Sequence, residues 1–161
     1  MLQSAPDNFL LYCAEFPFIM SFTALLNTAI EKRRDFFQQM STNQTDCYRV
    51  FHGTVEGING LNIDRYGDAW LIQTFHESLT AAALAEIETV LTELMPLPVI
   101  YNDRSAKNSR IGNDLTDQHD ELAKQALVMQ ENGIKFTTQL RHEGQDPLLF
   151  LDMRAGRQYM L

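Results

Sequence analysis

Residues 57–75 read GINGLNIDRYGDAWLIQTF, and this stretch decides the fold. Residues 61–66 and 69–75 are both strand-like, rich in apolar and aromatic residues, and only Gly67-Asp68 separates them. A two-residue connection with glycine first is typical of a type II′ turn, which suits the twist of two antiparallel strands. The stretch therefore predicts a β-hairpin over residues 61–75.

A second hairpin is predicted over residues 126–140. Residues 126–131 and 134–140 are strand-like, and Asn132-Gly133 lies between them. Asn-Gly is the strongest short-range hairpin signal, because both residues tolerate the positive φ angles of a tight turn.

Two helices are predicted, over residues 21–40 and 78–95. In both segments apolar residues recur mostly at spacings of three and four, which places them on one face of a helix. Ser78 is the predicted N-cap of the second helix, and Pro96 ends it.

The other segments complete an α+β fold with a small mixed sheet. Residues 47–52 and 99–101 are predicted strands, residues 53–60 a tight loop, and residues 105–125 an exposed loop with one helical turn. The tail from residue 145 is expected to turn helical. This order lacks regular βαβ alternation and any strand–glycine–helix unit that would hold a cofactor phosphate or nucleoside.

Composition is that of one soluble globular domain. The chain has 161 residues, of which 45% are hydrophobic and 21% charged, and its net charge is −8. Proteins that bind nucleic acid usually present a basic surface, so any RNA contact must use a local basic patch or another domain. No membrane span is predicted, and Cys13 and Cys47 are expected to be free thiols in a reducing cytoplasm.

Four stretches occur together in a characteristic order. They are YRVF at 48–51, GINGLNIDRYGD at 57–68, ENGIKF at 131–136, and GQ at 144–145 followed by FLDMRAGR at 150–157. Together they resemble the class I S-adenosylmethionine-dependent methyltransferases of large-subunit ribosomal RNA, the RlmI/RlmK kind. The resemblance covers about residues 46–161.

The resemblance implies that this region and the domain that binds S-adenosylmethionine have separate functions. In that family a region like this one precedes a Rossmann-like domain that binds S-adenosylmethionine, so the chain is expected to be truncated before that domain and inactive alone. Neither cysteine matches the position of the family's cytosine-attacking nucleophile, so no catalytic residue is assigned. The expected organisation is an N-terminal extension (1–20), a helix and linker (21–45), an RNA-facing α+β domain (46–143) and a segment leading into the missing methyltransferase domain (144–161).

Five residues are expected to border the cofactor in the intact enzyme. The resemblance places them just ahead of the S-adenosylmethionine domain: Gln145, Phe150, Asp152, Arg154 and Arg157. Arg154 and Arg157 are three apart, so a helix would put them on one face. The alternatives are a solvated, salt-bridged helix end for the two arginines and a loop glutamine in water for Gln145.

Four residues form the candidate RNA-binding cluster: Tyr101, Arg104, Lys107 and Arg110. Basic side chains near an aromatic ring can hold single-stranded RNA by phosphate contact and stacking. Neighbouring acidic residues weaken this cluster, which leaves an ordinary solvated loop as the alternative. For Asp64, a buried ion pair that organises the hairpin is favoured over RNA contact. The scattered histidines predict no metal site.

The leading hypothesis is an RNA-facing domain that positions ribosomal RNA for base methylation. The alternative is a non-enzymatic interaction module that forms a homodimer through an exposed apolar surface. The candidates for that surface are Leu148, Leu149, Phe150 and Met153.

Overall fold

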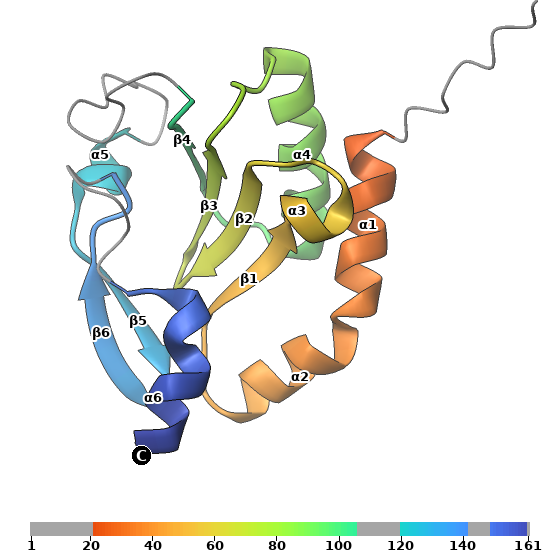
Figure 1. Cartoon of the computed structure of the whole chain (residues 1–161). Coiled ribbons are helices and arrows are strands. Elements are labelled where there is room, and N and C mark those ends of the chain that lie inside the picture. Colours follow the sequence, from red (N-terminus) through yellow and green to blue (C-terminus); the bar gives the residue numbers. More distant parts are fainter. Residues whose placement is uncertain (1–20, 106–119, 142–148, 161) are drawn as a thin grey trace, which may run out of the picture.

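The computed structural model describes residues 21–105, 120–141 and 149–160. Within them lie a four-stranded sheet in the order β1-β2-β3-β4 and a separate two-stranded sheet (Figure 1). The predicted α+β class is confirmed. Strand β4 is parallel to β3, and the other neighbours are antiparallel. The four strands are β1 (Cys47–His52), β2 (Leu61–Tyr66), β3 (Ala69–Thr74) and β4 (Val99–Asp103).

Both predicted hairpins are confirmed. Tyr66 pairs with Ala69 across a two-residue turn, and Gly67 has φ +59°, as the first position of a type II′ turn requires. The second hairpin joins β5 (Leu127–Glu131) to β6 (Ile134–Thr138). Its turn residues Asn132 and Gly133 have φ +52° and +77°, which is the pattern of a type I′ turn.

The prediction of one helix over residues 21–40 was wrong. Helix α1 (Phe22–Lys32) ends at Arg33, and α2 (Arg34–Thr42) begins after it. Arg33 has φ −106° and ψ 9°, which is outside helical geometry. Its guanidinium donates to the carbonyl of Ala29 and to Glu56, so contacts distant in sequence stabilise the break.

Other helices also differ from expectation. Helix α4 (Ala81–Leu94) is capped by Thr80, whose hydroxyl accepts from the backbone N–H of Ala83, rather than by Ser78. A short helix, α3 (Gly53–Glu56), replaces the first half of the predicted loop at 53–60. The last helices are α5 (Asp120–Lys124), the 3₁₀ turn η1 (Leu151–Met153) and α6 (Arg154–Met160).

The four-stranded sheet is covered on both faces, and every residue of β3 is buried. Helices α1 and α4 lie on one side of the sheet, and the β5–β6 hairpin with α5 lies on the other (Figure 1). Trp70 and Ile72 contribute to the core on the helical side, and Leu71 contributes to the core on the hairpin side. Leu149 belongs to the second core and is 6% exposed, so its predicted place on an exposed apolar surface was wrong.

Candidate functional site

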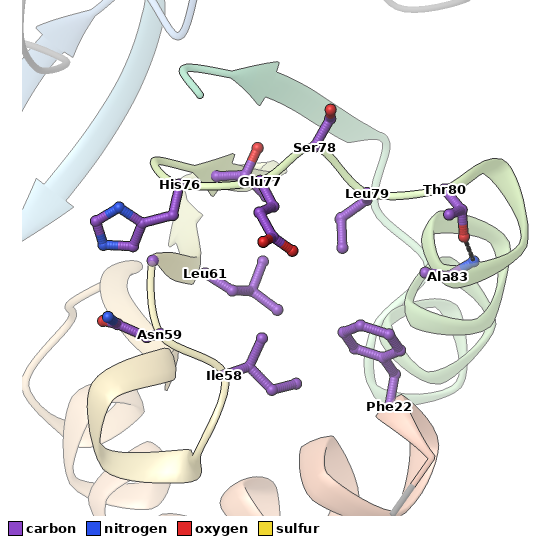
Figure 2. Close-up of a pocket in the computed structure, with 12 residues that line it drawn as sticks. Phe22, Ile58, Asn59, Leu61, His76, Glu77, Ser78, Leu79, Thr80 and Ala83 are labelled. Atoms are coloured by element: carbon purple, nitrogen blue, oxygen red, sulfur yellow. Dashed lines mark hydrogen bonds between the residues drawn. The ribbon is translucent and has the colours of Figure 1, made fainter. Parts of the chain in front are cut away.

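A cavity of about 480 Å³ opens at the edge where β3 ends and β2 begins (Figure 2). Apolar side chains from three separate segments, Phe22, Ile58 and Leu79, face a common space. Polar and charged groups complete the lining: Asn59, His76, Glu77, Ser78 and Thr80. An apolar floor with a few polar groups at the rim is the usual composition of a ligand pocket.

Local backbone geometry builds this cavity. Gly60 has φ +84°, and its carbonyl accepts from the N–H of Phe75 at 2.9 Å. A Cβ at Gly60 would lie 2.5 Å from the ring of His76, so glycine is needed for both the angle and the close approach. Tyr101 fixes the other wall, because its hydroxyl accepts from the N–H of Leu79 at 2.9 Å and hydrogen-bonds Thr74 at 3.0 Å.

Two of the four predicted RNA-binding residues can be placed, and both lie near this edge. Tyr101 is half-buried and holds the cavity wall through its hydroxyl. Arg104 is only 6% exposed, and its backbone N–H donates to Thr74 at 2.7 Å. Lys107 and Arg110 lie outside the described residues. RNA contact by these four residues stays a prediction.

Asp103 orders the chain at the end of β4, just before the predicted RNA-binding residues Lys107 and Arg110. Its carboxylate accepts from the N–H of Ser105 at 2.9 Å and from the hydroxyls of Ser105 and Thr74. Partial burial acts to raise the pKa of Asp103, but these hydrogen bonds outweigh it and hold the pKa below its ordinary value. The carboxylate is therefore ionised at neutral pH.

Arg154 and Arg157 converge on one carboxylate, that of Glu131 in β5. Arg157 donates to both carboxylate oxygens at 2.8 Å, and Arg154 donates to one of them at 3.2 Å. The hydrogen bonds from Arg157, and then those from Arg154, hold the pKa of Glu131 below its ordinary value against the effect of burial. Arg154 also donates to the carbonyl of Cys47 and the sulfur of Met40.

The two arginines therefore form ion pairs within this domain. They share a helix face as expected. Their common partner, Glu131, is buried, so they do not form the solvated helix end that was the alternative. Phe150 and Asp152 are exposed beside them, and Gln145 lies outside the described residues. Cofactor contact by these five residues stays a prediction.

A second cavity, of about 630 Å³, lies where α2, β1 and η1 meet, and no local pattern in the sequence predicts it. We call it the arginine groove; it is lined by Arg33, Phe36, Arg49, His52, Val55, Leu151, Asp152 and Arg154. Its basic residues come from three separate places in the sequence, so no spacing pattern could have revealed them together. Of these lining residues, only Asp152 and Arg154 are among the site residues that the sequence predicts.

Asp64 forms the buried ion pair expected of it, but with a partner in the neighbouring strand. Arg49 donates to its two oxygens at 2.7 and 3.1 Å, and the two residues are paired in the β1–β2 register. Burial acts to lower the pKa of Arg49, but the bond to Asp64 outweighs it and raises the pKa. Arg65 instead donates to the carbonyl of Gly67, at the hairpin turn.

Cys47 is a buried free thiol, and burial raises its pKa to about 11. Such a thiol stays protonated at neutral pH and is a poor nucleophile. Among the described residues, no three His, Cys, Asp or Glu side chains cluster as metal ligands. No helix in the same part of the chain is long and apolar enough to cross a membrane.

Comparison with known proteins points to one group of enzymes. The chain is 33% identical over 143 residues to ribosomal RNA large subunit methyltransferase I of Escherichia coli O127:H6, covering 86% of this chain and 35% of that protein. It is 26% identical over 140 residues to a ribosomal RNA large subunit methyltransferase of Deinococcus radiodurans, covering 84% of this chain and 34% of that protein. The chain is similar to one segment of these methyltransferases.

Solved structures agree with this similarity. SMU.776, assigned as a methyltransferase and complexed with SAH, matches with a TM-score of 0.65 and 25% identity over 86% of this chain and 34% of that one. A second solved structure, of a Streptococcus mutans protein assigned as an S-adenosylmethionine-dependent methyltransferase, has the same fold, with a TM-score of 0.63 at 23% identity. No family model matches the chain. The chain spans about a third of the length of the relatives it matches, which together support a methyltransferase relationship.

Proposed function

We propose that this chain forms the RNA-facing domain of an S-adenosylmethionine-dependent methyltransferase of large-subunit ribosomal RNA. The observation that carries the proposal is the 33% identity to such an enzyme, spread over 86% of the chain. The domain positions RNA, while base methylation belongs to a catalytic domain that these residues do not include. Holding the base beside the methyl donor is a large part of such catalysis, because it replaces a bimolecular encounter.

The absence of a methyl-donor cradle within the described residues supports this division. A nucleoside cofactor is typically held where a strand passes through a glycine-rich turn into a long helix. Strand β3 leads into the 14-residue helix α4 through residues 75–80, and this connection has no glycine. Strand β1 leads only into the four-residue helix α3. We infer that the intact enzyme holds S-adenosylmethionine outside the described residues.

RNA binding by the 161-residue chain is the direct test. Fluorescence anisotropy with a labelled single-stranded RNA should show binding that weakens as salt concentration rises, as phosphate contacts require. Incubation with unmodified large-subunit ribosomal RNA and labelled methyl donor should give no incorporation. Absence of RNA binding, or methyl turnover by this chain alone, would overturn the proposal.

The candidate RNA residues can be tested in the same assay. Lys107→Ala with Arg110→Ala should weaken binding and lower the salt dependence by about one phosphate contact for each charge removed. Lys135→Ala is the matched control, because Lys135 is exposed on the second hairpin, away from the cavity edge. Equal affinities for the double variant and the control would remove Lys107 and Arg110 from the RNA surface.

A second candidate function, a homodimeric interaction module, is favoured by the apolar residues near the end of the described chain. Four of them are 50–93% exposed: Phe150, Met153, Tyr159 and Met160. Exposed apolar patches often mark interfaces. Sedimentation should show a dimer that Met153→Lys converts to monomer. A monomer at all concentrations would exclude this function.

A further inference from the structure

The arginine groove brings three guanidinium groups and one imidazole to a single concave surface. Arg33 comes from the break between α1 and α2, Arg49 and His52 from β1, and Arg154 from the start of α6. The cavity of about 630 Å³ falls within the usual range for small-ligand sites, about 300–1,000 Å³. That size suits one or two nucleotides of a single strand rather than a duplex.

The carboxylate partners of these arginines lie beneath the groove. Each guanidinium is ion-paired at 2.7–3.2 Å, yet in every pair the acid is the more buried member. The exposed fractions of the side chains are 21% for Arg33 and 6% for Glu56, 30% for Arg49 and 1% for Asp64, and 12% for Arg154 and 2% for Glu131. The buried acids thus orient the guanidinium groups, and the arginine is the member of each pair that lines the groove.

The rest of the lining also suits a polar ligand with an apolar part. Phe36, Val55 and Leu151 form apolar wall, and Val55 is 74% exposed. The Nδ1 atom of His52 is buried without a hydrogen-bond partner among the described residues. Asp152 is the acidic residue of the lining, and an anion would avoid its side of the groove.

We propose that the arginine groove binds the phosphate backbone of the RNA substrate, with the sugar or base against Phe36 and Val55. Pre-oriented guanidinium groups are the preferred partners of phosphate, because their N–H donors match its geometry. In a chain of net charge −8, this groove brings together three arginines, each ion-paired with a carboxylate more buried than itself. This proposal rests on the proposed function and adds a second RNA contact surface to the predicted loop.

Charge placed at Val55 tests the groove without disturbing any ion pair. Val55→Glu should weaken the affinity for a labelled single-stranded RNA about fivefold near 0.1 M salt, and Val55→Lys should strengthen it by a similar factor. Val128→Glu is the matched control, because Val128 is also exposed, at 59%, but lies on β5 outside the groove lining. Urea unfolding of each variant checks that the fold is intact.

A double variant with unchanged net charge tests the contribution of one guanidinium group apart from the net charge of the protein. Arg33→Gln with Glu56→Gln removes one ion pair, leaves the net charge unchanged and keeps an acceptor for the N–H of His52. The slope of log affinity against log salt should fall by about one, as for the loss of one phosphate contact.

The outcomes distinguish this inference from the proposed function. No RNA binding by the unmodified chain overturns both. RNA binding that Val55→Glu weakens no more than Val128→Glu, with an unchanged salt slope in the double variant, overturns the groove alone. In that case a docking surface for a protein domain becomes the better account of the groove.

Discussion

Arg157 donates two parallel hydrogen bonds of 2.8 Å to the two carboxylate oxygens of Glu131, which connects the last helix to the second hairpin. Arg154 adds a third bond to the same carboxylate. Glu131 is 2% exposed, so α6 is held by an interaction that solvent hardly reaches.

Glu131→Ala should lower the free energy of unfolding by about 3 kcal/mol, because it leaves two largely buried arginines without their shared partner. The value is at the low end for a broken buried pair, since Arg157 remains 21% exposed. Glu131→Gln should cost less, because it keeps one acceptor oxygen. Urea unfolding at pH 7 measures both variants. A loss below about 0.5 kcal/mol for Glu131→Ala would show that α6 is not held by this cluster.

The contribution of Glu131 should depend on pH in one direction. Its pKa in the folded protein lies below the ordinary value of 4.5, so the folded state binds fewer protons than the unfolded state. The stabilisation is therefore complete above about pH 5 and is lost as the pH falls through the folded pKa. The difference in unfolding free energy between the unmodified chain and Glu131→Gln, measured from pH 7 to 3, should shrink toward acid. A constant difference would contradict this assignment.

The Arg49–Asp64 pair should behave as a coupled unit. Asp64→Ala should destabilise the protein by about 3 kcal/mol, at the low end for a broken buried pair because the Arg49 side chain is 30% exposed. Replacing both residues by leucine should restore most of that loss, since an apolar pair avoids the cost of desolvating two charges. A double-mutant cycle by urea unfolding measures the coupling. Strictly additive effects would show that the two side chains do not stabilise one another.

Two glycines should respond in opposite ways to alanine. A Cβ at Gly53 would meet the carbonyl oxygen of Ile58 and lie 2.6 Å from that of Leu61, so Gly53→Ala should cost about 3 kcal/mol. A Cβ at Gly156, in α6, meets nothing within 4 Å, and Gly156→Ala should stabilise the protein by up to about 1 kcal/mol through helix propensity. Thermal unfolding of the two variants should shift in opposite directions. Similar shifts would show that close approach at Gly53 is unimportant.

The parts of the fold that could be predicted depend on local chemistry. Gly67-Asp68 and Asn132-Gly133 specify their turns within two residues, so both hairpins were predicted with nearly correct bounds. The break at Arg33 could not be predicted, because residues 31–36 include good helix formers and the break depends on Glu56, 23 positions away. The N-cap of α4 was wrongly predicted at Ser78, because serine and threonine both suit that position and the sequence alone does not distinguish Ser78 from Thr80.

The candidate sites were predictable only in part, for a related reason. The spacing of Arg154 and Arg157 correctly placed them on one helix face, but their partner lies 23 and 26 positions earlier, on another strand. Burial of Arg104 likewise results from tertiary packing that its polar neighbours in sequence do not reveal. The arginine groove combines residues from both ends of the chain, so only the three-dimensional structure could bring them together.

The contact between Arg154 and the carbonyl of Cys47 has a consequence for self-association. Strand β1 ends the four-stranded sheet, and an uncovered end strand offers its backbone groups to strands of other molecules. Arg154 occupies one of these acceptors, and the N–H of Asp46, just before the strand, donates to Gln130. Loosening α6 would therefore uncover a template for aggregation, so variants that weaken the Glu131 cluster should precipitate at concentrations where the unmodified chain stays dispersed.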